Sequence, residues 1–264
     1  MTNKKLTIIS ISLLSIFLIA TFATLRQQAQ DQSLNQQKQT DNSDLKELPI
    51  VDFAQSDLAE ESSSRKKKNK RFNNRGSSDS KKMIDEFPEG VENLPTIVHW
   101  WVGLSALPLE SADAVVIGTV TNRKAYLSDD KTNVYSEYEV RIEKVLKNSG
   151  ESLKSNDMVA LVRLGGSVRF GSGKIQKYKI SQYGALQENH RYVMFLKKDN
   201  GVDLFITTGY DISGDKVIPI DGQDNKDPKN SLPFDKYLNA DSNALLKDID
   251  AVLQGYNGKG GTKQ

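Results

Sequence analysis

The sequence predicts a single all-β domain, either a small barrel or a sandwich, that follows an N-terminal transmembrane helix and a disordered tether and precedes a C-terminal helix. Three observations lead to this prediction. An uncharged run, 6–25, stands near the start, and a polar stretch with many charges follows it to about residue 94. From 111 to 221, short β-branched runs alternate with turn residues, and no long helical period separates them. The expected parts are therefore 1–26 (anchor), 27–94 (tether), 95–222 (β domain) and 223–264 (polar segment with a helix).

The uncharged run is long enough to cross a membrane. At about 1.5 Å per helical residue it spans about 30 Å, which is the thickness of the hydrocarbon core. Lys4 and Lys5 precede the run and only Arg26 closely follows it, so the positive-inside rule places the first residues in the cytoplasm and the rest outside. The alternative is a cleaved signal peptide with Thr21-Phe22-Ala23 at the cleavage site, which predicts a secreted protein.

The tether carries two adjacent charge blocks. Residues 41–61 hold seven acidic residues and one basic residue, and residues 62–82 hold nine basic residues and one acidic residue. One interpretation is a solvated spacer whose blocks neutralise each other. The other is a contact with an anionic envelope polymer or with lipid headgroups. The residues of that possible polyanion contact are Arg65, Lys66, Lys67, Lys68, Lys70, Arg71 and Arg75.

The first strands of the β domain follow from their apolar patterns. Residues 113–120 are β-branched and apolar on both faces, as in a buried central strand. In 137–143 Tyr138, Val140 and Ile142 alternate with charged residues, so one face, which includes Glu137, is expected in water.

The later strands are separated by turns rich in glycine. Residues 158–164 and 167–170 are expected to form a hairpin through Gly165-Gly166, and Gly171-Ser172-Gly173 leads into 174–180. Residues 192–196 are a predicted central strand, Asp199-Asn200-Gly201 turns the chain into 202–207, and 216–220 is a last short strand.

One amphipathic helix is expected after the strands, over 240–253. Its apolar residues lie on one helical face, Asp241 or Ser242 caps its start, and Gly255 ends it. The apolar face is expected to pack on the strands or to cover a sheet edge, with partner binding as the alternative. The residues of that face are Ala244, Leu245, Ile249, Val252 and Leu253.

A resemblance accompanies this pattern between 112 and 196. The order AD.VV.G.V, Y.V.I..VLK, V.L.R.GG and RYVMFL resembles a pattern common among uncharacterised bacterial exported proteins. More distantly it resembles the OB-like barrel of netrin and tissue-metalloprotease-inhibitor modules. This resemblance implies the fold alone, because the inhibitor family acts through an N-terminal cysteine and disulfides and this chain has no cysteine.

The composition favours binding over catalysis. With no cysteine and two histidines, thiolate metal sites, thiol chemistry and a conventional triad have few candidate residues. Asp129 and Asp130 lack the calcium-loop spacing, and the glycine turns lack the phosphate-loop continuation, so no cofactor or metal is expected. His190 is expected in a turn. The cluster His99, Trp100 and Trp101 is expected to pack as an entry strand, with ligand stacking or membrane-interface contact as the alternative.

We therefore expect a membrane-tethered, extracytoplasmic, non-enzymatic module that binds a protein or an envelope polymer. One alternative is a polyanion-binding protein that acts through the basic tether, and another is a hydrolase whose site the sequence does not reveal. Nucleic acid is a disfavoured partner because the net charge is only +2 and the basic block contains a single aromatic residue, Phe72.

Overall fold

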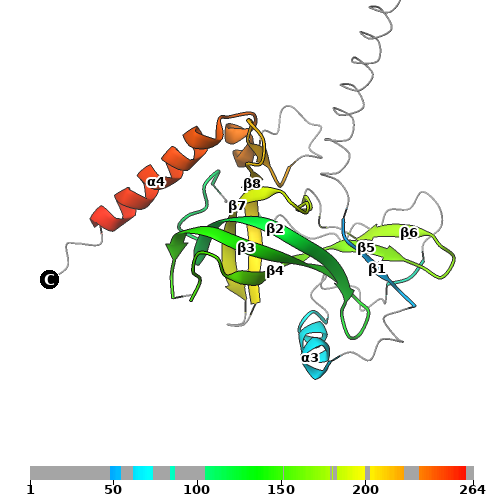
Figure 1. The fold of residues 1–264 in the computed structure, drawn as a ribbon. Helices are drawn as coiled ribbons and strands as arrows, with labels where there is room; N and C mark the ends of the chain where they lie inside the picture. Colours follow the sequence, from blue (N-terminus) through cyan, green and yellow to red (C-terminus); the bar gives the residue numbers. More distant parts are fainter. Residues whose placement is uncertain are drawn as a thin grey trace, which may run out of the picture. The chain divides into compact units, whose positions relative to one another are not determined.

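A computed structural model describes residues 48–54, 62–73, 84–86, 105–150, 152–178, 180, 183–199, 203–222 and 232–259. All of them belong to one compact unit, 47–264. Most of the secondary structure in this described part is β strand, so the prediction of a β-rich domain is confirmed (Figure 1). No helix within the described part is long and apolar enough to span a membrane, and the predicted anchor, 1–26, lies outside it.

Among the described elements, one α-helix precedes the main strands, and a 3-10 helix and one α-helix follow them. The elements are β1 (Ile50–Asp52), α3 (Ser63–Arg71), β2 (Ala114–Leu127), β3 (Val134–Asn148), β4 (Met158–Leu164), β5 (Gly166–Arg169), β6 (Ile175–Tyr178), β7 (Arg191–Asp199), β8 (Asp203–Asp211), β9 (Ile218–Pro219), the 3-10 helix η1 (Pro233–Tyr237) and α4 (Ser242–Lys259).

The strands form two sheets. The larger has the order β4-β3-β2-β7-β8-β9, with antiparallel neighbours, and the smaller has the order β1-β5-β6. A further, parallel pairing of β4 with β8 sets Leu161 opposite Leu204 and Val162 opposite Phe205. Because β4 and β8 are the first and fifth strands of the larger sheet, this pairing joins five strands into a closed ring, which we call the closed sheet.

The central strands β2 and β7 are buried on both faces, as their apolar runs predict. Val116 and Met194 lie in one apolar cluster with residues of β3, β4 and β8, and Val115 and Phe195 lie in a second cluster. The second cluster also contains residues of η1 and α4. Alternate residues of β2 and β7 therefore point to opposite faces of the sheet and pack into two different apolar clusters.

A predicted hairpin at Gly165 is wrong. β4 stays paired with β3, whereas β5 leaves for the smaller sheet, where it pairs with β1 and β6. Gly165 has φ 103°, a conformation that favours glycine, and it turns the chain between the two sheets. The hairpin β5–β6 is confirmed. In the pair β7–β8, Asp199 lies opposite Asp203, as the predicted turn requires.

The C-terminal helix α4 packs through part of its predicted apolar face, whereas Ala244 and Val252 of that face are exposed, so their predicted burial is wrong. Leu245 and Ile249 are fully buried in the second cluster. The Asp241 carboxylate accepts hydrogen bonds from the backbone N–H groups of Asn243 and Ala244 at 2.8 and 3.3 Å, so Asp241 is the N-cap. The predicted end at Gly255 is wrong, because the helix continues to Lys259.

The largest correction concerns the tether. Residues 48–54, 62–73 and 84–86, which we call the strap, pack on the β strands, so the prediction of a disordered tether is wrong for them. β1 adds to β5 in parallel. Ile84 is buried with Val168 and Tyr178, and α3 lies against the closed sheet. Single apolar residues in this polar stretch, such as Ile84 and Phe72, are buried. They form no helical or strand period in the sequence, so periodicity does not predict their burial.

Candidate functional site

The basic block forms the helix α3. The hydroxyl of Ser62 caps the helix by accepting a hydrogen bond from the backbone N–H of Arg65 at 3.2 Å. Lysine and arginine are good helix formers, and the basic residues of the last turn interact favourably with the negative end of the helix dipole. At the other end, the Phe72 N–H donates to the carbonyls of Asn69 and Lys70. The helix Ser63–Arg71 contains no apolar residue, so a hydrophobic stripe cannot hold it.

One side of α3 nevertheless faces the sheet. Arg65, Lys68, Asn69 and Phe72 follow the spacing i, i+3, i+4 and i+7, which places them on one helical face. We call these four residues the inner stripe. Asn69 and Phe72 are buried, and Arg65 and Lys68 are half-buried.

The surface beneath the inner stripe is built by strand register. Tyr126 of β2 lies opposite Tyr135 of β3, and Glu137 of β3 lies opposite Val162 of β4. The closing pairing of β4 with β8 then brings Phe205, and Asp203 two residues before it, toward Glu137. We call Tyr126, Tyr135, Glu137, Asp203 and Phe205 the docking face.

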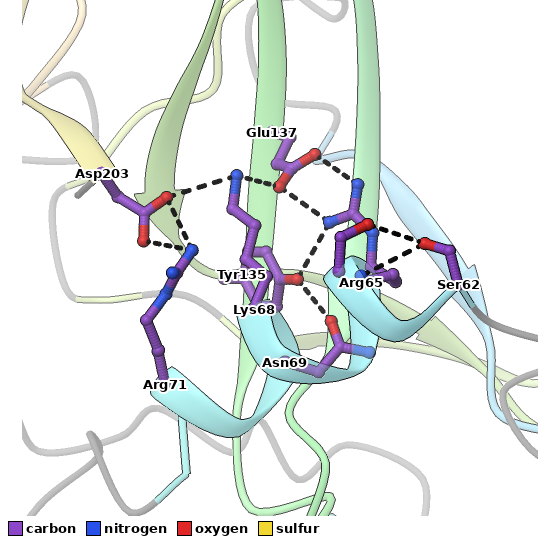
Figure 2. A network of polar contacts seen from close by, with 9 residues as sticks. Ser62, Arg65, Lys68, Asn69, Arg71, Tyr135, Glu137 and Asp203 are labelled. Atoms are coloured by element: carbon purple, nitrogen blue, oxygen red, sulfur yellow. Dashed lines mark hydrogen bonds and ion pairs between the residues drawn. The ribbon is translucent and has the colours of Figure 1, made fainter.

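Ion pairs join the docking face to α3 (Figure 2). The guanidinium of Arg65 donates to both carboxylate oxygens of Glu137, at 2.7 and 2.8 Å. The Lys68 ammonium lies between Glu137, with which it forms a close ion pair, and Asp203 at 3.4 Å. The Arg71 guanidinium contacts the two oxygens of Asp203 at 3.0 and 3.2 Å. Three cations of the helix thus share two carboxylates of the sheet.

Aromatic contacts surround the ion pairs. The ring of Phe72 stacks on that of Tyr135 with centroids 3.8 Å apart and planes at 11°, and the ring of Phe205 lies 5.9 Å away. The Arg65 guanidinium lies 3.8 Å from the centroid of the Tyr126 ring, in a cation–π contact. The Tyr135 hydroxyl donates to the Asn69 carboxamide oxygen at 2.5 Å. These contacts fix both the position and the rotation of α3.

The charges at this site reinforce one another. Burial raises the pKa of Glu137, but hydrogen bonds and charge from Arg65 and Lys68 outweigh that effect, so the pKa lies below its usual value. Burial raises the pKa of Tyr135 well above its usual value, despite the opposing hydrogen bond from Arg65. At neutral pH the docking face therefore presents the charged carboxylate of Glu137 and the neutral phenol of Tyr135.

The structure divides the predicted polyanion contact into two sets. Arg65, Lys68 and Arg71 point to the docking face and are paired there, whereas Lys66, Lys67 and Lys70 are exposed on the opposite side of α3. Arg75 lies outside the described residues. The predicted cluster of His99, Trp100 and Trp101 also lies outside them.

Sequence reasoning missed the whole docking face. Glu137, expected in water, is only 8% exposed because α3 covers it, and this expectation is wrong. A signal was present in the helix itself. Ser62 is followed by cations and an amide at helical spacing and then by an aromatic residue, which is the pattern of a capped helix with one specialised face.

Other polar clusters are tied to local structure. The buried pair of Arg163 and Asp221, 2.5 Å apart, joins β4 to the chain after β9. The Asp130 carboxylate accepts hydrogen bonds from the Ser128 and Thr132 hydroxyls, within its own turn. Within the described part of the chain, no three histidine or acidic residues are grouped as metal ligands would be.

One histidine has the orientation that acid–base chemistry needs. In the turn before β7, Nδ1 of His190 lies 2.6 Å from the Asp211 carboxylate. The nearby Ser213 hydroxyl instead accepts a hydrogen bond from the backbone N–H of Arg191 at 2.7 Å. His190 is therefore paired with an acid, but the Ser213 hydroxyl is bonded to the backbone. A serine nucleophile would instead be hydrogen-bonded to its histidine base.

Comparison with known proteins adds no assignment. No protein-family model matches this chain, and a search of curated proteins finds no match to it.

Proposed function

We propose that this chain is a non-enzymatic, membrane-tethered, extracytoplasmic module that binds a protein partner through the docking face. The observation that carries the proposal is the pair of carboxylates, Glu137 and Asp203, set among aromatic rings on rigid strands. Their side chains are 10% and 11% exposed, and they already hold a basic helix. A surface of this kind favours a basic segment with an aromatic residue over an anionic ligand.

The topology supports an OB-like barrel as the scaffold. The five strands of the closed sheet are numbered 1 to 5 in chain order, from β2 through β3, β4 and β7 to β8. Around the ring their order is 1-2-3-5-4, and strands 3 and 5 pair in parallel. OB folds are five-stranded Greek-key barrels that bind ligands on strands 2 and 3 and on the loops 1–2 and 4–5. Tyr135 and Glu137 belong to β3, which is strand 2 in this numbering, and Asp203 begins β8, which is strand 5, so their positions support ligand binding on this part of the sheet.

The proposed anchor is 1–26, and the strap shortens the spacer behind it. Residues 27–47 remain between the anchor and the strap, which is 47 − 26 = 21 residues. Even fully extended, a chain of this length spans at most about 75 Å. The module is therefore proposed to act close to the outer surface of the membrane.

The test is capture of full-length protein from detergent-solubilised membranes at low and at high salt, with identification of the retained proteins. The face variant Glu137→Gln/Asp203→Asn is compared with a control of equal charge change, Glu139→Gln/Asp129→Asn, whose residues are exposed. We expect a protein that the wild type and the control retain and the face variant loses. The same retained set from all three proteins would contradict the proposal.

The proposed location has its own test. Protease added to intact cells should digest 111–221 if the domain is extracytoplasmic. Digestion of this region only after lysis would contradict that location.

A second function is favoured by one observation. Lys66, Lys67 and Lys70 remain exposed on the outer side of docked α3 and are available to an anionic polymer or to headgroups. Each basic residue near such a surface contributes about 1 kcal/mol. Replacement of all three by Gln should reduce the salt dependence of binding to anionic vesicles or polymer. An unchanged salt dependence would argue against a polyanion role for these lysines.

A further inference from the structure

Helix α3 lies between two separate attachments of the strap to the β strands. Before it, β1 pairs with β5, and after it Ile84 is buried with Val168 and Tyr178. Neither attachment uses a residue of α3. Residues 55–61 and 74–83 connect them to the helix, which is 61 − 54 = 7 and 83 − 73 = 10 residues. Separation of α3 from the docking face therefore requires no break in either attachment.

The contacts of α3 are also of a kind that another helix can replace. The helix contributes the buried side chains of Asn69 and Phe72 and cations whose side chains are 16% to 27% exposed. Ion pairs of this exposure are partly offset by desolvation and are screened by salt. The docking face has the opposite character, because its residues belong to strands that stay paired with their neighbours when α3 leaves.

An empty docking face would be costly. The rings of Tyr135 and Phe205 would lose their contacts with Phe72 and be left in water, and Glu137 and Asp203 would lose nearby cations. Occupation of the face by a helix with cations and an aromatic ring is therefore favoured over an empty face. α3 supplies one from the same chain, at the high effective concentration that short connections give.

We infer that α3 is an internal competitor for the docking face, and that the partner it excludes is a helix of another protein with the same stripe. This inference rests on the proposed function. The stripe is a cation at i, a second cation at i+3, a carboxamide at i+4 and an aromatic residue at i+7. Recognition follows from the contacts of Arg65, Lys68, Asn69 and Phe72, since Glu137 takes the cations, Tyr135 donates to the carboxamide and the aromatic rings pack on the aromatic residue.

The binding experiment uses the full chain in detergent and two labelled peptides. One peptide has the sequence of residues 62–73, and the other has the same composition with the stripe residues moved to other faces. The release variant Arg65→Gln/Lys68→Gln removes two cations from the inner stripe. The matched variant Lys66→Gln/Lys67→Gln removes two exposed cations from the same helix.

The release variant should bind the 62–73 peptide more tightly than the wild type does. If α3 occupies nine-tenths of the wild-type faces, the apparent affinity of the peptide is reduced about tenfold, and release restores it. The matched variant should bind as weakly as the wild type. The permuted peptide should bind about tenfold more weakly than the 62–73 peptide, and addition of Glu137→Gln/Asp203→Asn to the release variant should remove binding. Equal affinities for the wild type and the release variant, or for the two peptides, would overturn the inference.

A second measurement needs no variant and so does not depend on the folding of one. Saturating 62–73 peptide added to the wild type should speed hydrogen exchange at the amides of α3 and leave those of α4 unchanged. Unchanged exchange in α3 with the peptide bound would overturn the inference. A wild-type dimer that the peptide dissociates would assign the occupant to a second copy of this chain and overturn its assignment to another protein.

The two proposals fail in different ways. If the release variant binds the peptide but capture from membranes finds no partner that depends on the docking face, the proposed function fails and the competition by α3 stands. If capture finds such a partner but the peptide does not bind, the function stands and the inference fails.

Discussion

Helices α3 and α4 both pack on the β strands, but different forces hold them. α4 buries Leu245 and Ile249 completely, and Leu246 and Leu253 pack partly against the same cluster. α3 has no apolar residue between Ser63 and Arg71 and is held by cations that meet Glu137 and Asp203. The hydrophobic contact of α4 has no charges for salt to screen, whereas the ionic contact of α3 is screened by salt.

This difference separates a structural element from an exchangeable one. Apolar burial contributes to the stability of the whole unit, and its loss is felt throughout a cooperative fold. A charged contact on a preformed surface can be lost locally, because the strands beneath it stay paired through their own hydrogen bonds. The following substitutions test whether the two helices behave in these two ways.

The largest effect is expected at α4. Ile249→Ala should reduce the free energy of unfolding by about 2–5 kcal/mol, because it opens a cavity in a fully buried cluster. Urea denaturation would measure the loss, which should be the same at low and high salt. Val252→Ala, at a position 39% exposed on the same helix, is the control and should change stability by no more than about 0.5 kcal/mol. If Ile249→Ala cost no more free energy of unfolding than Val252→Ala, α4 would not contribute to the core.

The next largest effect is expected at Phe72. Phe72→Ala removes the only buried ring that α3 brings to the docking face. We expect a loss of about 2–3 kcal/mol, below the usual range for a buried phenylalanine, because α3 can detach without global unfolding. Hydrogen exchange should quicken in α3 and stay unchanged in α4. Quicker exchange in both helices, absent from a Met158→Ala control at an exposed site, would show that α3 and α4 unfold as one unit.

The same contrast explains how much the sequence predicts. α4, the central strands and the hairpins β5–β6 and β7–β8 have local signals, namely apolar periodicity and turn residues, and these were predicted. The predicted hairpin at Gly165 is wrong because two glycines between strands are also the pattern of a hairpin turn. Only the pairing of β5 with β1, a segment more than 100 residues away in the chain, shows that the strand changes sheets.

The docking face has no local signal at all. Glu137 lies on the alternate, charged face of its strand, as an exposed residue does, and Asp203 follows a turn. They come together only through the parallel pairing of β4 with β8. Without that pairing, the charges of α3 have no visible counterpart, and a charged helical stripe looks like a solvated tether. The errors at Glu137 and in the tether are therefore one error.

The ionic contact itself is tested at Glu137. Glu137→Gln leaves Arg65 and Lys68 without their main carboxylate and should cost about 1–3 kcal/mol at low salt. At about 1 M salt the Debye length is about 3 Å, so the difference from the wild type should shrink. Glu139→Gln, two residues along the same strand at an exposed site, is the control. A difference that persists at high salt would mean that α3 is held by packing instead of charge.

Acid should produce a smaller change with a definite sign. The folded pKa of Glu137 lies below its usual value of about 4.3, so the charged form stabilises the fold. This stability is fully present above the unfolded pKa and is lost as pH falls through the lower folded pKa. Other acids also titrate in this range, so the useful quantity is the difference in urea midpoint between the wild type and Glu137→Gln. It should stay constant from about pH 7 to about pH 5 and shrink toward about pH 3. If the difference instead grew on acidification, the Glu137 carboxylate would be destabilising when charged, and the ion pairs with Arg65 and Lys68 would not be what holds α3 on the docking face.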